Sequence, residues 1–166
     1  QNVVIGSTNA AANLTTGVQN VFIGDKCVTN NTNYCVYVGH MEDMVTMGNA
    51  ATAIGSYAGN GSNIPNDATI VGHRTRLIGS GVAIGSNAQS SYSGMVLLGY
   101  LAGDGQNAGN YGIALGHGAK TGANTFAVGG VNAPINTVVL GKGNDDFQST
   151  ANLAGSQVQL RISSPR

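Results

Sequence analysis

Three histidines occupy one position of a repeated pattern, each directly after the glycine that ends a short apolar run. They are His40, His73 and His117. A neutral imidazole is a common metal ligand, so copies of one histidine that meet in an oligomer could bind a metal ion. In other copies of the pattern the same position holds Asp25 or Lys142. A position that accepts both charges is typical of a solvated turn, so we expect no metal there.

Acidic pairs and serine-rich segments also suggest little chemistry. Asp145 and Asp146 lack the further spaced acids of a calcium loop, which favours a solvated loop. Glu42 and Asp43 would point to opposite sides of a strand, which is poor geometry for paired acid–base catalysis. The segment 90–93 is serine-rich but lacks the glycine frame of a nucleophile elbow. We therefore expect no catalytic residues, no enzymatic activity and no cofactor.

Two cysteines lie eight residues apart, at positions where other copies of the pattern carry small residues. Cys27 lies three residues after a motif glycine, at a position where alanine recurs. Cys35 lies four residues before a motif glycine, where alanine or glycine recurs. We expect two buried thiols that act as small apolar side chains. A disulfide is the alternative, and a metal-binding or catalytic role is a third possibility.

The pattern that positions these residues is a tetrad of three mostly apolar residues followed by glycine. Ten copies occur between residues 3 and 141, at intervals that average 15 residues; they are 3–6, 21–24, 36–39, 52–55, 69–72, 82–85, 96–99, 113–116, 126–129 and 138–141. Valine, isoleucine and leucine dominate the tetrads, as expected for short strands that end at glycine. A repeat this short cannot bury a core alone. The sequence therefore predicts an all-β stack, a parallel β-solenoid of about ten coils.

Both faces of each predicted strand are apolar, although a thin coil has only one interior. We expect the residue before each glycine to form the core, which comprises Ile5, Ile23, Val38, Ile54, Val71, Ile84, Leu98, Leu115, Val128 and Leu140. The residue two before each glycine is then expected to face another subunit; this set is Val4, Phe22, Tyr37, Ala53, Ile70, Ala83, Leu97, Ala114, Ala127 and Val139. An uncovered apolar face requires a partner, so the pattern predicts self-association.

Composition narrows the classes of partner. Charged residues make up 8% of the chain and the formal net charge is +0, without the basic clusters that nucleic acid requires. No apolar stretch approaches the ~18–20 residues that span a membrane, so we expect no membrane insertion. The predicted organisation is a repeat domain over 1–141 and an irregular segment over 142–166 with one terminal strand, 157–162. Because the chain begins at Gln1, we interpret it as a processed or excised piece of a longer chain.

The tetrads and their flanks resemble repeats of two related families. The segment 80–88 resembles the head repeats of trimeric autotransporter adhesins (YadA-like), and the segments 15–24 and 48–59 look even more like a variant common in phage tail fibres. The resemblance covers residues 3 to about 141. It implies a left-handed parallel β-roll assembled as a parallel homotrimer, with chains intertwined or side by side.

The resemblance also implies a function and a location. Two features favour the phage branch. Cysteine is harmless in a fibre assembled in a reducing cytoplasm, and an end at Arg166 fits removal of a downstream chaperone. We expect a tail fibre of a virion that attaches to a host receptor, either a glycan or an outer-membrane component. The alternatives are an adhesin head on a bacterial cell surface and a purely structural fibre spacer.

Exposed aromatic and amide side chains outside the tetrads are the candidate receptor contacts, because such groups commonly grip sugars and protein surfaces. The alternative is that the tyrosines only cover corners of the coil. The candidates are Tyr57, Asn60, Asn63, Tyr92, Tyr100, Asp104, Gln106, Asn107 and Tyr111.

Overall fold

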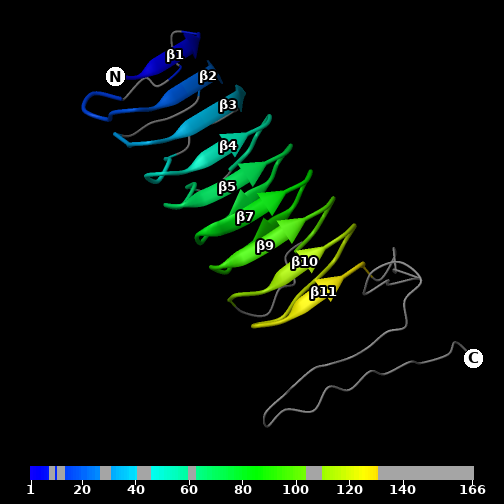
Figure 1. Ribbon diagram of the computed structural model, residues 1–166. Helices are drawn as coiled ribbons and strands as arrows, with labels where there is room; N and C mark the ends of the chain where they lie inside the picture. Colours follow the sequence, from blue (N-terminus) through cyan, green and yellow to red (C-terminus); the bar gives the residue numbers. More distant parts are fainter. Residues whose placement is uncertain are drawn as a thin grey trace, which may run out of the picture. The chain divides into compact units, whose positions relative to one another are not determined.

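The computed structural model describes most of the first 130 residues: 1–7, 10, 14–26, 31–40, 46–59, 63–103 and 110–130. Within these ranges the chain is all-β and contains no helix. It winds into a parallel solenoid in which the strands stack one above another (Figure 1). The predicted all-β parallel β-solenoid is therefore confirmed.

One nine-stranded parallel sheet forms the main wall of the solenoid. Its order is β1-β2-β3-β4-β5-β7-β9-β10-β11. The strands are β1 (Val3–Gly6), β2 (Val21–Asp25), β3 (Val36–His40), β4 (Thr52–Ile54), β5 (Ala68–Val71), β7 (Gly81–Ile84), β9 (Met95–Leu98), β10 (Ile113–Leu115) and β11 (Phe126–Val128). A second wall contains the short parallel pair β6 (Arg76–Leu77) and β8 (Gln89–Ser90).

The tetrads pair with one another residue for residue. Phe22 is paired with Tyr37, Tyr37 with Ala53 and Ala53 with Ile70. The same register continues to β11. The apolar tetrad therefore sets the register of the stack. The tenth tetrad, 138–141, lies outside the described residues, so the prediction of ten coils remains untested for that copy.

The predicted assignment of the two strand faces is wrong. In the described coils between the first and the last, the residue two before each glycine points into the coil and is fully buried: Phe22, Tyr37, Ala53, Ile70, Ala83, Leu97 and Ala114. The predicted core residues instead lie on the outer face and are partly or mostly exposed: Ile5, Ile23, Val38, Ile54, Val71, Ile84, Leu98, Leu115 and Val128.

The chain position of the buried small residues explains this inversion. Cys35, Ala51 and Ala68 lie directly before their tetrads and are fully buried. Side chains of a strand alternate between faces, so the second residue of each tetrad shares the inner face with them. Val4 and Ala127 occupy the same column in the first and last described strands, where they are not fully buried. Leu140 and Val139 lie outside the described residues.

Motif glycines allow neighbouring coils to approach closely. Gly85 has φ +138°, a conformation that other residues rarely adopt. A Cβ atom there would collide with the carbonyl group of Gly99 in the next coil. After each motif glycine the chain turns, and the amide of Ala88 donates to the carbonyl of Gly85 over 3.3 Å. The glycine column therefore forms one corner of the solenoid.

Asparagines form a ladder along the opposite corner, ahead of the strands. The amide of Val18 donates to Oδ1 of Asn33 over 2.9 Å, and the amide of Asn33 donates to Oδ1 of Asn49 over 2.9 Å. The amide of Asn49 in turn donates to Oδ1 of Asn66 over 2.8 Å. Each asparagine thus satisfies a backbone donor of the preceding coil. The ladder holds the corners of four coils in register.

The chain divides into two compact units, residues 1–135 and 136–166. All of the described residues belong to the first unit. The predicted boundary between 141 and 142, the predicted strand 157–162 and the acidic pair Asp145–Asp146 lie outside the described residues.

We predict that Gly85→Ala strongly destabilises the solenoid, because the new methyl group meets backbone that cannot move aside. Strain at such a φ alone costs about 1–3 kcal/mol. Gly118→Ala is the matched control, since Gly118 also has positive φ, +63°, but has open space around its Cα. The control should cost only about 1 kcal/mol. Thermal unfolding followed by circular dichroism measures both; equal losses would contradict the role of the glycine column.

Candidate functional site

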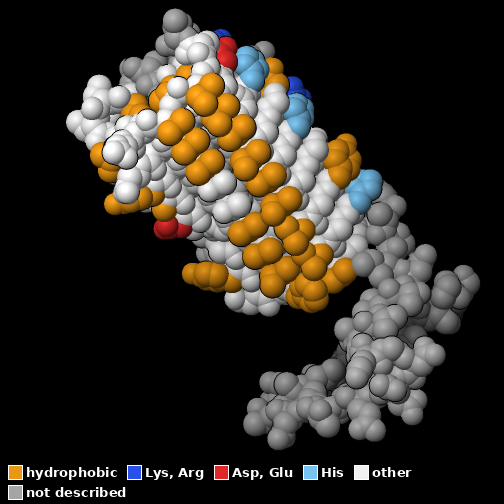
Figure 2. Space-filling model, turned by 45° about the horizontal axis from the view of Figure 1, so that its top comes forward, with side chains coloured by type: hydrophobic (Ala, Val, Ile, Leu, Met, Phe, Trp, Pro, Cys, Tyr) orange, Lys and Arg blue, Asp and Glu red, His pale blue; other side chains and the backbone are white. Residues whose placement is uncertain are grey.

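An apolar face covers the outside of the nine-stranded sheet. It consists of two columns, the first and third residues of the tetrads. Thr52 and Thr69 interrupt the first column, whereas the third column is apolar throughout. The face includes Ile5, Ile54, Ile84, Leu98, Ile113 and Phe126. Figure 2 shows this outer face as a diagonal band of hydrophobic side chains. Phe126 is 64% exposed and Ile5 is 58% exposed. Apolar surface this continuous is typical of an interaction surface.

Histidines and tyrosines line the corner beside this face. The ring of Tyr57 lies edge-on to His40 and His73, with centroid separations of 5.8 Å and 5.6 Å. The guanidinium of Arg74 lies 5.8 Å from the centroid of the same ring. Farther along the corner, the ring centroids of Tyr100 and His117 are 5.1 Å apart. Two of the predicted receptor residues, Tyr57 and Tyr100, thus belong to a column of ring side chains visible along one edge of the apolar face (Figure 2).

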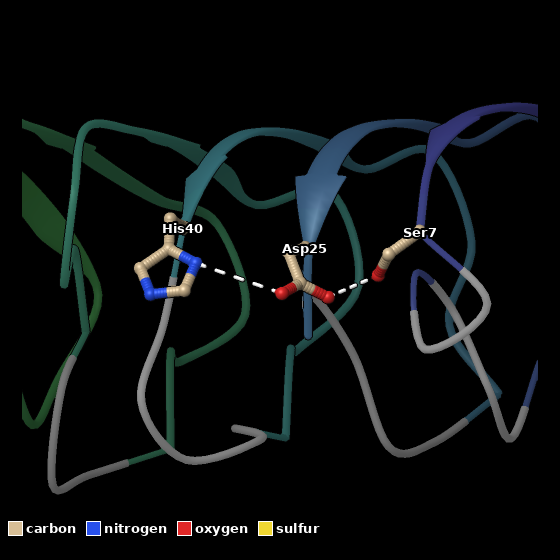
Figure 3. Close-up of polar contacts among 3 residues, drawn as sticks. All are labelled: Ser7, Asp25 and His40. Carbon is tan, nitrogen blue, oxygen red and sulfur yellow. Dashed lines mark hydrogen bonds and ion pairs between the residues drawn. The ribbon is translucent and has the colours of Figure 1, made fainter.

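The first coils place a serine, an aspartate and a histidine in a row (Figure 3). The hydroxyl of Ser7 donates to Oδ1 of Asp25, and Nδ1 of His40 lies 3.8 Å from Oδ2 of Asp25. In a hydrolytic triad the histidine stands between serine and aspartate, so that it can take the serine proton. Here the aspartate stands between the serine and the histidine. This row has the residues of a triad but not its connectivity.

Hydrogen bonding sets the titration of Asp25. The hydroxyl of Ser7 is the main cause that lowers the pKa of this carboxyl; the backbone amide of Lys26 and the charges of His40 and Lys26 also favour the ionised form. Because the folded-state pKa is lowered, the contact stabilises the fold above the ordinary carboxyl pKa of about 3.9. This contribution is lost as the pH falls through the lowered value.

A shallow recess of about 340 Å³ opens where the chain approaches the asparagine ladder. Met47, Gly48, Ile64 and Pro65 form its base; Asn31, Thr46, Asn49, Asn63 and Asn66 line it with polar groups. The strand-like pairing of Met47 with Ile64 places these segments side by side. The recess contains one predicted receptor residue, Asn63. The roles of Asn49 and Asn66 escaped the sequence analysis, although asparagine three residues before the tetrad recurs at 33, 49, 66 and 110.

The other predicted receptor residues are scattered. Tyr111 is 67% exposed, at the corner ahead of β10, and its ring lies against Gly94 of the preceding coil. Tyr92 is 38% exposed, and its amide donates to the hydroxyl of Ser90 over 3.0 Å. The structure therefore brings Tyr57 to a corner different from that of Tyr111. The candidates Asn60, Asp104, Gln106 and Asn107 lie outside the described residues.

Cys35 is a free, fully buried thiol. Its sulfur lies 2.8 Å from the hydroxyl oxygen of Thr32 and donates to the carbonyl of Gly48 over 3.0 Å. The expected burial is confirmed for this residue, and its surroundings are polar as well as apolar. Cys27, Glu42 and Asp43 lie outside the described residues.

The described residues hold no metal-ligand cluster and no helix that could span a membrane. No group of three or more histidine, cysteine, aspartate or glutamate side chains gathers there in a way that could hold a metal ion. The three histidines are instead distributed along the solenoid. The same part of the chain has no helix of the length and hydropathy needed to cross a membrane.

We predict that Ser7→Ala raises the pKa of Asp25 toward its ordinary value, because the main hydrogen bond to the ionised carboxyl is removed. Carboxyl-carbon NMR titration measures the pKa directly. Ser56→Ala is the control, since Ser56 occupies the equivalent position two coils beyond Asp25. An unchanged pKa in Ser7→Ala would contradict the assigned cause.

Comparisons with known proteins identify no relative: no family model, no curated protein and no solved structure matches this chain.

Proposed function

We propose that this chain is a segment of a self-associating, non-enzymatic extracellular fibre. The observation that supports it best is the apolar outer face of the nine-stranded sheet, which continues over every described coil. Isolated exposed apolar side chains are ordinary on soluble proteins, whereas a continuous band favours burial against a partner. A second copy of the same chain supplies a band of the same length and period.

The assembly that we propose is a parallel homotrimer. Three bands that face a common axis bury one another along the whole rod, and parallel chains keep equivalent coils level. The number three and the left-handed winding rest on the resemblance of segments 15–24, 48–59 and 80–88 to the fibre and adhesin repeats. In the structure, the face that the sequence analysis assigned to the core lies outside. The proposed interface residues are therefore Ile23, Val38, Ile54, Ile84 and Leu98 and their neighbours on the outer face.

The function that we propose for this rod is host attachment in a phage tail fibre. A trimer presents three copies of every corner side chain, so weak contacts with a repetitive cell surface gain avidity. The column around Tyr57, with its flanking histidines and Arg74, is the strongest aromatic contact surface among the described residues. A bacterial adhesin head is the second candidate, favoured by the resemblance of segment 80–88. A purely structural spacer is the third.

Light scattering on the purified chain tests self-association. We expect a native mass about three times that of the 16.7 kDa protomer. The variant Ile84→Asp should remain folded and become monomeric, since Ile84 lies on the outer face and a charge cannot be buried there in the assembly.

The neighbouring residue provides the matched control for that variant. Ala83 is fully buried inside the coil, so Ala83→Asp should fail to fold rather than dissociate. Circular dichroism separates the two outcomes. A wild-type chain that remains monomeric at high concentration, or an Ile84→Asp variant of trimeric mass, would contradict the proposed interface.

Cell-binding measurements test the attachment role. We expect Tyr57→Ala to reduce binding of the trimer to host cells at least about tenfold, the scale of a central aromatic contact. Tyr34→Ala is the control, because Tyr34 is an exposed tyrosine at the opposite corner whose φ, +62°, is similar to the +58° of the half-buried Tyr57. Correct trimers that bind no cells would favour the structural spacer.

A further inference from the structure

The asparagine recess is large enough to accept a small ligand. Its volume of about 340 Å³ falls at the lower end of the range for small-molecule sites, about 300–1,000 Å³. None of its nine lining residues carries a charge. A charged ligand would find no counter-ion among them, so the lining favours a neutral ligand that forms hydrogen bonds.

The corner ladder fixes the orientation of two amides in the recess. Oδ1 of Asn49 accepts the amide of Asn33, and Oδ1 of Asn66 accepts the amide of Asn49. Each side chain therefore has its oxygen engaged by backbone and presents its Nδ2 group as a donor. No described residue accepts a hydrogen bond from either Nδ2 group. Because the donors are oriented before a ligand arrives, binding does not need to order them.

Asn31 reinforces the same wall from a neighbouring segment. Its Oδ1 accepts the amide of Thr16 over 2.9 Å, and its Nδ2 donates to the hydroxyl of Thr15 over 3.0 Å. This amide is held at both ends and acts as a fixed side of the recess. Asn63, which is exposed, completes the polar lining.

The base of the recess is apolar. Pro65 is half-buried, and Met47 and Ile64 are each 1% exposed. An apolar base beside two oriented amide donors matches an acetamido group. The carbonyl of this group accepts from Nδ2 donors, while its methyl group packs on Pro65. Hexoses without the acetamido group have no such methyl group. Their hydroxyl groups can donate as well as accept, whereas the acetamido carbonyl can only accept a hydrogen bond.

We propose that the asparagine recess binds the acetamido group of a neutral N-acetylhexosamine. The inference deepens the proposed attachment function by naming a site and a ligand class. The recess lies within one protomer, so its lining does not require the trimer.

Protein-observed NMR with four probes tests the proposal on the full chain. The probes are N-acetylglucosamine and N-acetylgalactosamine, with glucose and galactose as counterparts that lack the acetamido group. We expect at least one N-acetyl sugar to shift the amide resonances of Asn49, Asn63 and Asn66, with much smaller shifts for its counterpart. Equal shifts with glucose or galactose, or no shift at the recess with either N-acetyl sugar, would overturn the proposal.

Substitutions within the ladder provide a matched pair. Asn49→Asp keeps the oxygen that accepts the amide of Asn33 but replaces the donor with a second oxygen, which repels a carbonyl. We expect a loss of affinity of at least about tenfold. Asn110→Asp makes the same change at the equivalent position ahead of β10, where Oδ1 accepts the amide of Ser93 over 2.9 Å; Asn110 is outside the recess, so its substitution should leave affinity unchanged. Equal losses in both variants would also overturn the proposal.

The two proposals fail separately in these measurements. If the chain is a trimer but its recess does not bind N-acetyl sugars, the ligand proposal is refuted and the proposed fibre assembly stands. If the chain is a monomer that binds N-acetyl sugars in the recess, the ligand proposal is supported and the proposed fibre assembly is refuted.

Discussion

The structure depends on the close approach of one coil to the next at the motif glycines. Each glycine from Gly6 to Gly99 lies so near the next motif glycine in the stack that a Cβ atom would collide with its backbone. This contact keeps the tetrads level, so that apolar side chains form continuous columns along the solenoid. The apolar outer face is made of such columns, and the aromatic corner around Tyr57 and the asparagine recess lie beside them.

Because the coils stack in parallel, each position of the repeat forms a column of side chains. Columns that differ in residue type form distinct surfaces. From Tyr37 to Ala114 the inner tetrad column alternates large and small side chains, as in Ile70, Ala83, Leu97 and Ala114, which lets neighbouring coils interdigitate. Of the two outer columns, the one formed by the third residue of each tetrad is the more uniform, with isoleucine, valine and leucine throughout. Uniform branched side chains form a smooth band that suits a second copy of the same band. The corner columns carry the polar and aromatic groups, because turns leave them facing solvent.

The two candidate contact regions differ in how firmly their side chains are held. Tyr57 is held by ring contacts and by Arg74, all of which lie at a solvated corner. Asn49 and Asn66 are held by backbone hydrogen bonds between coils, so their orientation follows from the fold itself. A repeated backbone can in this way build a binding surface from residues that would be mobile on an ordinary loop. The buried Asn20 shows the same principle inside the coil, where its Oδ1 accepts the amide of Cys35.

The sequence by itself determined the class of fold and located nine strands to within one residue at each end, because the tetrad recurs and ends in glycine each time. It also placed Cys35 in the interior and Tyr57, Tyr92, Tyr100 and Tyr111 outside the strands. Only the tertiary structure decided which face of the strand lies inside. Both faces are apolar, so hydropathy alone does not distinguish them. The small residues directly before several tetrads, such as Cys35, Ala51 and Ala68, did indicate which face lies inside. The recess likewise depended on the structure, since the contact of Met47 with Ile64 and the asparagine ladder join residues from separate coils.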